Sequence, residues 1–318
     1  MTRSLLLALL LVSRGAGAQA ISTTGVERDT RQASFWRLTY DNDFFTATDR
    51  YFTQGIAIEV MSPGLRRVPA MRALLVPAGS TMRYGVLYED DGYTSSDLKA
   101  AQILTGDHPY AGTKQLRVFA IAVDSARRQH VTSSLNVGII GQGAGGAEIQ
   151  TFIHRHTGNT IPQGWSNQIR NDVILNYEAG IERALSGAGH HFLVTGRASA
   201  RLGTYNTAIT SGITLMAGQF GDPFGVATPR RAFFAYLKPQ LNVVGYDATL
   251  QGGLFNRTSP YTIAARDLSR LVYRQQAGFV YRSGNRYVEY YRSLGTPEFH
   301  GARMHRTGGL LVGMTTGR

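Results

Sequence analysis

Polar and apolar residues alternate with a period of two over long stretches of this chain, and this alternation constrains its fold more than any other feature. Because successive side chains of a β-strand point to opposite faces, such a strand has one apolar and one polar face. The clearest case is the segment 171–182. Its apolar face carries Val173, Leu175, Tyr177, Ala179 and Ile181, and its opposite face carries Asp172, Asn176, Glu178, Gly180 and Glu182. In a membrane β-barrel the first face contacts lipid and the second faces the lumen.

The same pattern predicts about twelve strands along the chain. They are expected at 34–41, 52–61, 83–90, 116–123, 133–140, 171–182, 191–202, 207–218, 231–245, 269–282, 286–294 and 304–315. A soluble β-sandwich could show similar alternation. An even number of strands, with lengths near the roughly ten residues that a tilted spanning strand needs, favours an all-β, transmembrane antiparallel β-barrel.

A secretory signal precedes the alternating segments. Residues 1–20 combine a basic start at Arg3, an apolar stretch at 5–12 and small residues that end at Ala18 and Ala20, after either of which cleavage is expected. A membrane anchor is the rival interpretation, but the apolar stretch is far shorter than the roughly 20 residues that span a bilayer. We therefore expect a signal peptide over 1–20 and one domain, the barrel, over 21–318, because no Pro/Ser/Gly-rich linker divides it.

Composition narrows the functions that the chain could have. The net charge is +12 at pH 7, and about ten positive charges remain after removal of Arg3 and Arg14. A basic surface suits nucleic acid, anionic lipid or a phosphorylated glycolipid, and export argues against nucleic acid. The chain contains no cysteine, which excludes disulfides, thiolate metal sites and cysteine nucleophiles.

The predicted topology places the unusual polar segments on one side of the membrane. If the termini of an even-stranded barrel lie in the periplasm, the loops after odd-numbered strands face the cell exterior. The first three of these loops, near 42–51, 91–115 and 141–170, hold almost all of the polar clusters. The third is long for a structureless loop, so we expect a short helix between Gly146 and Gly158.

The first of these loops packs three carboxylates and an amide into nine residues, from Asp41 to Asp49. Oxygen-rich groups of this kind suit a hard cation such as Ca²⁺. By alternation, Asp43 is expected to point inward at the rim, as is Thr53 on the returning strand. A polar hairpin with Asx turns is the competing interpretation. The segment is not an EF-hand loop, because it lacks that motif's central Gly and terminal Glu.

The third loop contains His154 and His156, which differ in position by two and so point in different directions on a helix. A histidine on a surface helix is usually only solvated, and a general base is the alternative. The chain has no Gly-x-Ser-x-Gly motif for a serine nucleophile. Two further segments could be rigid turns: Asp107-His108-Pro109-Tyr110-Ala111-Gly112 and Pro162-Gln163-Gly164-Trp165.

These segments, taken together and in order, resemble the lipid A 3′-O-deacylase (LpxR-type) outer-membrane family. The resemblance covers most of the chain after residue 20 and is strongest between about 35 and 182. It rests on Asp41-Asn42-Asp43-Phe44 followed by 48–55, on the segment 107–112, on 138–150 with His154, and on 162–165 with Asn167-Gln168. Each motif alone would be unspecific.

The resemblance implies a twelve-stranded barrel that removes the 3′-linked acyloxyacyl group of lipid A in a Ca²⁺-dependent reaction. The family's Asn-Asp pair falls on Asn42 and Asp43, which with Thr53 would supply the metal ligands, and its catalytic histidine falls on His154. A lysine that contacts a lipid phosphate has no secure match, and Lys99 lies near that place. Some members carry an acidic residue shortly after the histidine, where this chain reads Asn159-Thr160-Ile161.

The sequence thus predicts an outer-membrane esterase with its site facing the cell exterior and lipid A or lipopolysaccharide as its partner, acting as a monomer. In this mechanism His154 takes a proton from water while Ca²⁺ near Asp43 stabilises the oxyanion. Two alternatives remain open. The same residues could serve a phospholipase-type esterase, or the chain could be a non-enzymatic structural barrel whose rim residues only bind ions.

Overall fold

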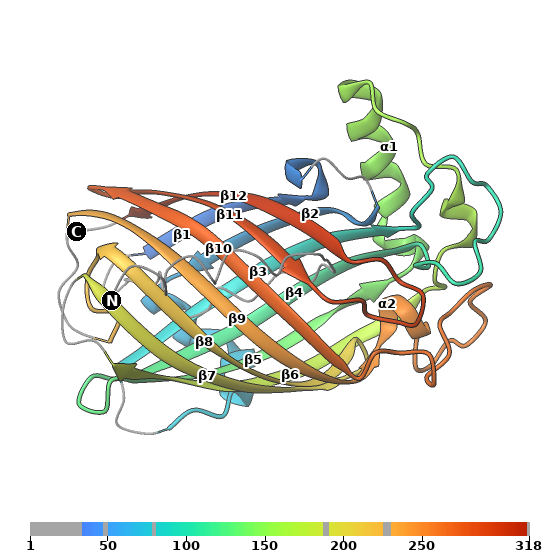
Figure 1. Cartoon of the computed structure of the whole chain (residues 1–318). Helices are drawn as coiled ribbons and strands as arrows, with labels where there is room; N and C mark the ends of the chain where they lie inside the picture. Colours follow the sequence, from blue (N-terminus) through green and yellow to red (C-terminus); the bar gives the residue numbers. More distant parts are fainter. Residues whose placement is uncertain (1–33, 47–49, 78–80, 187–190, 225–229, 317–318) are drawn as a thin grey trace, which may run out of the picture.

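Twelve antiparallel strands close into a barrel in which each strand pairs with its neighbours in sequence and β1 pairs with β12 (Figure 1). The computed structural model describes residues 34–46, 50–77, 81–186, 191–224 and 230–316. The strands are β1 (Ser34–Asn42), β2 (Tyr51–Met61), β3 (Thr81–Thr94), β4 (Ala111–Asp124), β5 (Gln129–Ile140), β6 (Asp172–Ser186), β7 (Phe192–Gly203), β8 (Asn206–Gln219), β9 (Arg231–Asp247), β10 (Leu271–Ser283), β11 (Arg286–Gly295) and β12 (His305–Thr316).

The predicted fold is confirmed, and each predicted strand range overlaps one observed strand. The main difference is length. For example, β3 and β4 run over Thr81–Thr94 and Ala111–Asp124, whereas alternation indicated only 83–90 and 116–123. The additional residues include Gly92 and Gly112, which pair through their backbones without contributing to an apolar pattern. The expected signal peptide, residues 1–20, lies outside the described residues.

Short helices connect the strands. They are η1 (Asp43–Thr46), η2 (Pro63–Arg67), η3 (Pro69–Ala73), η4 (Gln142–Ala144), α1 (Gly146–Thr157), η5 (Gly164–Asn167) and α2 (Ala248–Gln251). The helix α1 confirms the one expected between Gly146 and Gly158. In the described parts of the chain, no helix is both long and apolar enough to cross a membrane.

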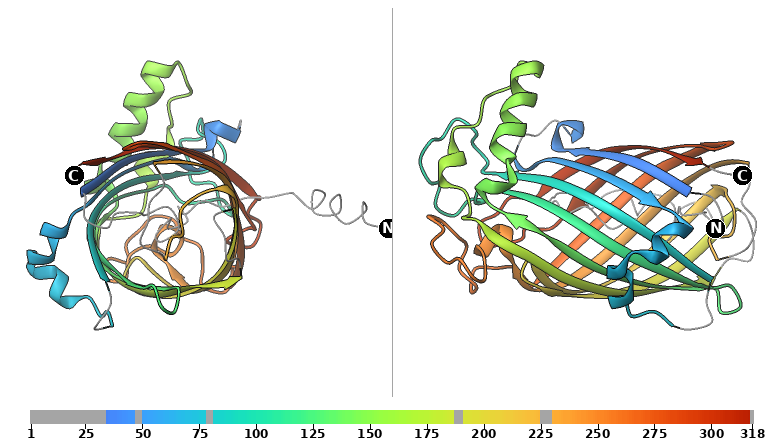
Figure 2. Two further views of the ribbon diagram at one scale, coloured as in Figure 1. Left: turned by 90° about the vertical axis from the view of Figure 1, so that its left-hand side faces the viewer. Right: turned by 180° about the vertical axis from the view of Figure 1, so that it is seen from behind.

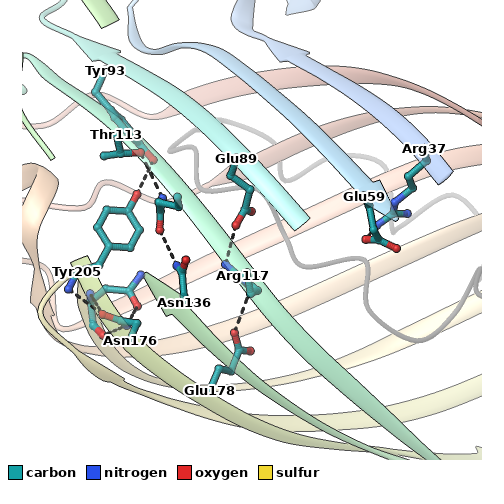
Figure 3. Close-up of polar contacts among 12 residues, drawn as sticks. Arg37, Glu59, Glu89, Tyr93, Thr113, Arg117, Asn136, Asn176, Glu178 and Tyr205 are labelled. Carbon is teal, nitrogen blue, oxygen red and sulfur yellow. Dashed lines mark hydrogen bonds and ion pairs between the residues drawn. The ribbon is translucent and has the colours of Figure 1, made fainter. Parts of the chain in front are cut away.

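The lumen of the barrel is filled by charged side chains that pair with one another (Figure 3). Arg37 lies 3.0 Å from Glu59, and Arg117 lies between Glu89 at 3.0 Å and Glu178 at 3.7 Å. Buried charges need such partners because desolvation of a lone charge is very costly. The cavity that remains among these side chains has a volume of about 80 Å³, far too small for a wide channel.

The outer face of the wall carries the alternate residues of the same strands and is apolar. Examples are Leu38, Ile58, Leu116, Leu175 and Phe279, all of which are exposed large apolar side chains. Such a surface suits the hydrocarbon core of a bilayer. The alternation in the sequence therefore marks the two faces correctly over most of each strand.

One end of the barrel carries both α1 and η1, which lie on the outer side of the wall in two different views (Figures 1 and 2). The opposite end carries the first residue of β1 and the last residue of β12, since Ser34 pairs with Thr316. We refer to the two as the α1 end and the terminal end. Asn42, Asp43, Thr53 and His154, which the sequence singled out, belong to elements at the α1 end.

Candidate active site between the barrel wall and helix α1

Helix α1 presents one buried face to the barrel. Its buried residues are Gly146, Gln150 and His154, which are spaced four apart and therefore share one side of the helix. The helix contacts β3 and β4. It ends at Thr157 and is capped by Gly158, whose φ of 69° is the left-handed conformation that glycine adopts without strain.

A close approach of two backbones holds the start of α1 against the wall. A Cβ atom on Gly112 of β4 would lie 3.1 Å from the backbone nitrogen of Gly146. A Cβ atom on Gly146 would lie 2.9 Å from the ring of Trp165. A side chain at Gly146 would displace Trp165, and one at Gly112 would press on the first residue of α1, so both glycines favour the close approach of α1 to the wall.

Gln150 links the helix to the wall and to the segment that follows it. Its side-chain amide donates to Oγ1 of Thr53 over 2.7 Å, and its side-chain carbonyl accepts from Nε1 of Trp165 over 2.8 Å. The ring of Trp165 packs edge-on against Tyr110, with centroids 5.1 Å apart. Gln150 has 0% exposure, so both of its polar groups are satisfied inside the protein.

Thr53 does not point into the lumen, and that expectation was wrong. The pairing of β2 with β3 shifts between Phe52, which lies opposite Tyr93, and Gln54, which lies opposite Gly92. Thr53 is the additional residue of this β-bulge, and a bulge resets the alternation of the strand. Its side chain therefore meets Gln150 of α1 on the outer side of the wall.

Asp43 also departs from the expected inward orientation. β1 ends at Asn42, so alternation does not extend to Asp43, which is the first residue of η1. Asp41 lines the lumen cavity, and Asn42, as the next strand residue, faces outward. The Asn42 amide donates to the carbonyl of Thr53 over 2.5 Å, and its Oδ1 accepts from the backbone N–H of Phe44 over 2.6 Å.

The oxygen donors of this region fit a hard cation. The Asp43 carboxylate is 1% exposed, and one of its oxygens accepts from the backbone N–H of Arg50 over 2.6 Å. The preceding residue, Asn42, is joined to the carbonyl of Thr53 by the hydrogen bond above. Calcium prefers such a mixture of carboxylate, amide, hydroxyl and carbonyl oxygens. Among the described residues, no group of three or more His, Cys, Asp or Glu side chains is arranged to hold a metal ion.

His154 is held in a defined orientation at the end of α1. Its Nδ1 lies 2.5 Å from the carbonyl oxygen of Thr160. A carbonyl oxygen only accepts, so Nδ1 carries the proton and donates, and Nε2 of a neutral ring retains its lone pair. His154 is buried, whereas His156 is exposed, bonds the carbonyl of Phe152 over 2.8 Å and packs on the Phe152 ring. The expected difference between the two histidines is confirmed.

Lys99 is not joined to this group. It is exposed, and its backbone N–H donates to the side chain of Asp97. The lysine that does lie beside α1 is Lys114, whose Nζ is 3.5 Å from the buried carboxylate of Asp90. A Cβ atom on Gly145, just before α1, would be 3.1 Å from that Nζ.

The segment 107–112 positions the site and does not supply its reactive groups. Asp107 accepts hydrogen bonds from the backbone N–H and the hydroxyl of Ser96, and the His108 ring stacks on Tyr93 with centroids 5.5 Å apart. Burial raises the pKa of the Tyr110 phenol, which keeps this packing residue neutral. These contacts anchor the loop on which Tyr110 meets Trp165.

Sequence reasoning missed Gln150 and Trp165 as members of the site. Gln150 precedes His154 by four residues, and this spacing was the available signal, because it predicts a shared helix face. The partner of that face could not be read from the sequence. Thr53 is 97 residues away from Gln150, and only the folded wall brings them together.

A model of the family described as outer membrane protein LpxR matches residues 5–316 of this chain. Among solved structures, LpxR from Salmonella typhimurium is similar, with 16% identity and a TM-score of 0.70, over 88% of this chain and 99% of that one. The translocator domain of the autotransporter NalP from Neisseria meningitidis has 10% identity and a TM-score of 0.47, over 92% of this chain and 90% of that one. A search of curated proteins found no match.

Proposed function

This chain belongs to the outer membrane protein LpxR family, and on that premise we propose that it hydrolyses the 3′-linked acyl ester of lipid A. The observation that carries the proposal is the orientation of the His154 ring and the position of its proton. Its Nδ1–H donates to the Thr160 carbonyl, so Nε2 is available to accept a proton. The ring lies on the face of α1 that Gln150 ties to Thr53 of the wall.

The lateral position of the site supports a lipid substrate. The network of Asn42, Thr53, Gln150 and Trp165 lies between the wall and α1, beside an outer face that is apolar along its strands. A lipid in the surrounding leaflet reaches such a place without entering the barrel. The lumen, filled by charged pairs, offers no comparable route.

In the proposed reaction, Nε2 of His154 accepts a proton from water as the water oxygen attacks the carbonyl carbon of the ester. The resulting tetrahedral intermediate collapses, the bond to the sugar oxygen breaks, and the imidazolium returns the proton to that oxygen. The products are a free fatty acid and a sugar hydroxyl. Asp43, with oxygens of Asn42 and Thr53, would hold calcium, which would supply positive charge near a developing oxyanion.

The Thr160 carbonyl takes the place of an orienting acidic side chain. Members of the family that carry an acidic residue shortly after the histidine have a carboxylate available there, whereas this chain has Asn159-Thr160-Ile161. A backbone carbonyl fixes the same tautomer of the ring, because a histidine base needs only a hydrogen-bond acceptor at its other nitrogen. The departure from the family pattern is therefore compatible with His154 as the base.

We further propose that the α1 end faces the cell exterior. Lipid A lies in the outer leaflet of the outer membrane, and the terminal end of an even-stranded barrel faces the periplasm. Protease added to intact cells should then cut within the loops of the α1 end and leave the terminal end intact. Cleavage only at the terminal end would reverse this orientation.

The decisive experiment is mass spectrometry of purified lipid A after incubation with the purified protein in detergent. We expect loss of the 3′-linked acyloxyacyl group with calcium and no loss with a chelator. Phospholipid in place of lipid A tests the phospholipase-type alternative. If neither lipid loses an acyl chain under conditions in which the barrel is folded, the proposed activity is wrong and a non-enzymatic barrel remains.

A further inference from the structure

A groove on the outer face of the wall lies beside η1, formed by β10, β11 and β12 at the α1 end. Its volume is about 500 Å³. Phe44 and Phe45 of η1 line one side, and Gln275, Arg292 and Arg306 line the wall side. Only the backbone N–H of Phe44 contacts the network around Thr53 and Gln150, through Oδ1 of Asn42.

Two arginines on adjacent strands give the groove its charge. On β11 and β12, Leu294 pairs with Arg306 and Arg292 pairs with Gly308. Arg292 and Arg306 are therefore diagonal neighbours, offset by two residues along the strands, and they lie on the same outer face. Both residues are exposed. Within the described ranges, neither forms a salt bridge, whereas lumen arginines such as Arg37 and Arg117 pair with carboxylates. Nε of Arg292 donates to the hydroxyl of Tyr290 at 2.9 Å.

The apolar side of the groove is held in place by the wall itself. The Thr46 hydroxyl is 2.8 Å from the carbonyl of Asp43 and 2.9 Å from that of Arg306. Phe45 packs over Gly308, where a Cβ atom would lie 2.6 Å from the Cβ of Phe45. Phe44 is 75% exposed, although it is large and apolar. The groove thus combines two cationic groups that lack a carboxylate partner with an aromatic surface.

We propose that Arg292 and Arg306 bind a phosphate group of the glycolipid substrate, while an acyl chain of the same molecule packs on Phe44 and Phe45. Guanidinium groups recognise phosphate oxygens through paired, charge-assisted hydrogen bonds. The groove faces the leaflet, where such a headgroup with attached chains is available. The proposal rests on the proposed function, since it names a second contact for the same lipid.

The position of η1 connects the groove to the candidate active site. Asp43 begins η1 and Thr46 ends it, so one short helix borders both places. A lipid whose phosphate lies on the arginines would extend past η1 toward the network of Thr53 and Gln150. The distant phosphate would then strengthen binding of the whole lipid equally in the ground state and the transition state.

The test compares the double variant Arg292→Gln/Arg306→Gln with the control Arg286→Gln. Arg286 lies on the same strand as Arg292 and on the same outer face, but at the terminal end. Binding is measured by equilibrium titration in detergent, in the His154→Asn background so that no hydrolysis interferes. The two probes are phosphorylated lipid A and the same lipid A after enzymatic dephosphorylation.

We expect the double variant to bind phosphorylated lipid A at least about tenfold more weakly, and dephosphorylated lipid A unchanged, whereas the control retains both affinities. In protein with His154 intact, KM should rise while kcat changes little. If the double variant still prefers phosphorylated lipid A as wild type does, the groove assignment is overturned. Failure of wild type to deacylate lipid A, with the arginine-dependent preference intact, would instead overturn the proposed function alone.

Discussion

Replacement of His154 by asparagine tests the proposed mechanism most directly. Asparagine keeps an N–H donor near the place of Nδ1, which can still bond the Thr160 carbonyl, but it has no atom at the position of Nε2. A positioned general base contributes roughly a hundredfold or more to rate, which corresponds to about 2.7 kcal/mol of transition-state stabilisation. Loss of one hydrogen bond costs only about 1 kcal/mol of stability, so unfolding cannot account for a deficit of that size.

The matched control is His156→Asn. His156 has the same side chain and belongs to the same helical turn, but it is exposed, and its ring bonds and packs on Phe152 of its own helix. The assay is the initial rate of 3′-linked acyl release from purified lipid A in detergent at saturating calcium, with the fraction of folded barrel measured by heat-modifiable gel migration. We expect at least about a hundredfold loss for His154→Asn and a change within a few-fold for His156→Asn. Full activity in the first variant, or equal loss in both, would refute the assignment of the base.

Three further variants test the metal, the helix and the lumen. Asp43→Ala should abolish both hydrolysis and calcium binding, measured by titration, while the barrel stays folded. Asp49→Ala should reduce both less than Asp43→Ala does. If neither variant reduced hydrolysis or calcium binding, the assignment of calcium to Asp43 would be wrong. Gly112→Val should lower activity at least about tenfold without loss of the heat-modifiable barrel, because its side chain would collide with the start of α1; wild-type turnover would show that α1 need not touch the wall. Glu59→Gln should destabilise the barrel by about 1.5–3 kcal/mol, since it removes the charge from the carboxylate that bonds the buried Arg37, and an unchanged unfolding temperature in detergent would contradict that reasoning.

The sequence by itself determined the fold and the order of its parts. Alternation marks which residues of each strand face the lumen, because the pleat of a strand places neighbours on opposite sides regardless of what surrounds it. The helical period likewise predicted that His154 and His156 lie on different faces of the helix. Both inferences depend only on contacts between residues near one another in sequence, and both hold in the structure.

Only the tertiary structure decided where the site lies. Alternation placed Thr53 and Asp43 inside the barrel, but a bulge after Phe52 and the end of β1 at Asn42 put their groups on the outer side. A bulge has no strong signature in one sequence, because it depends on how two strands pair along their whole length.

The site also needs α1 to dock on the wall, and that docking rests on contacts across long stretches of chain. Gly112 must meet Gly146, and Gln150 must reach Thr53, 97 residues earlier. Periodicity is a local property and carries no information about which distant surface a helix will cover. The sequence could therefore name candidate residues, whereas only the folded barrel decided that Thr53 and Gln150 meet on the outer side of the wall and not within the lumen.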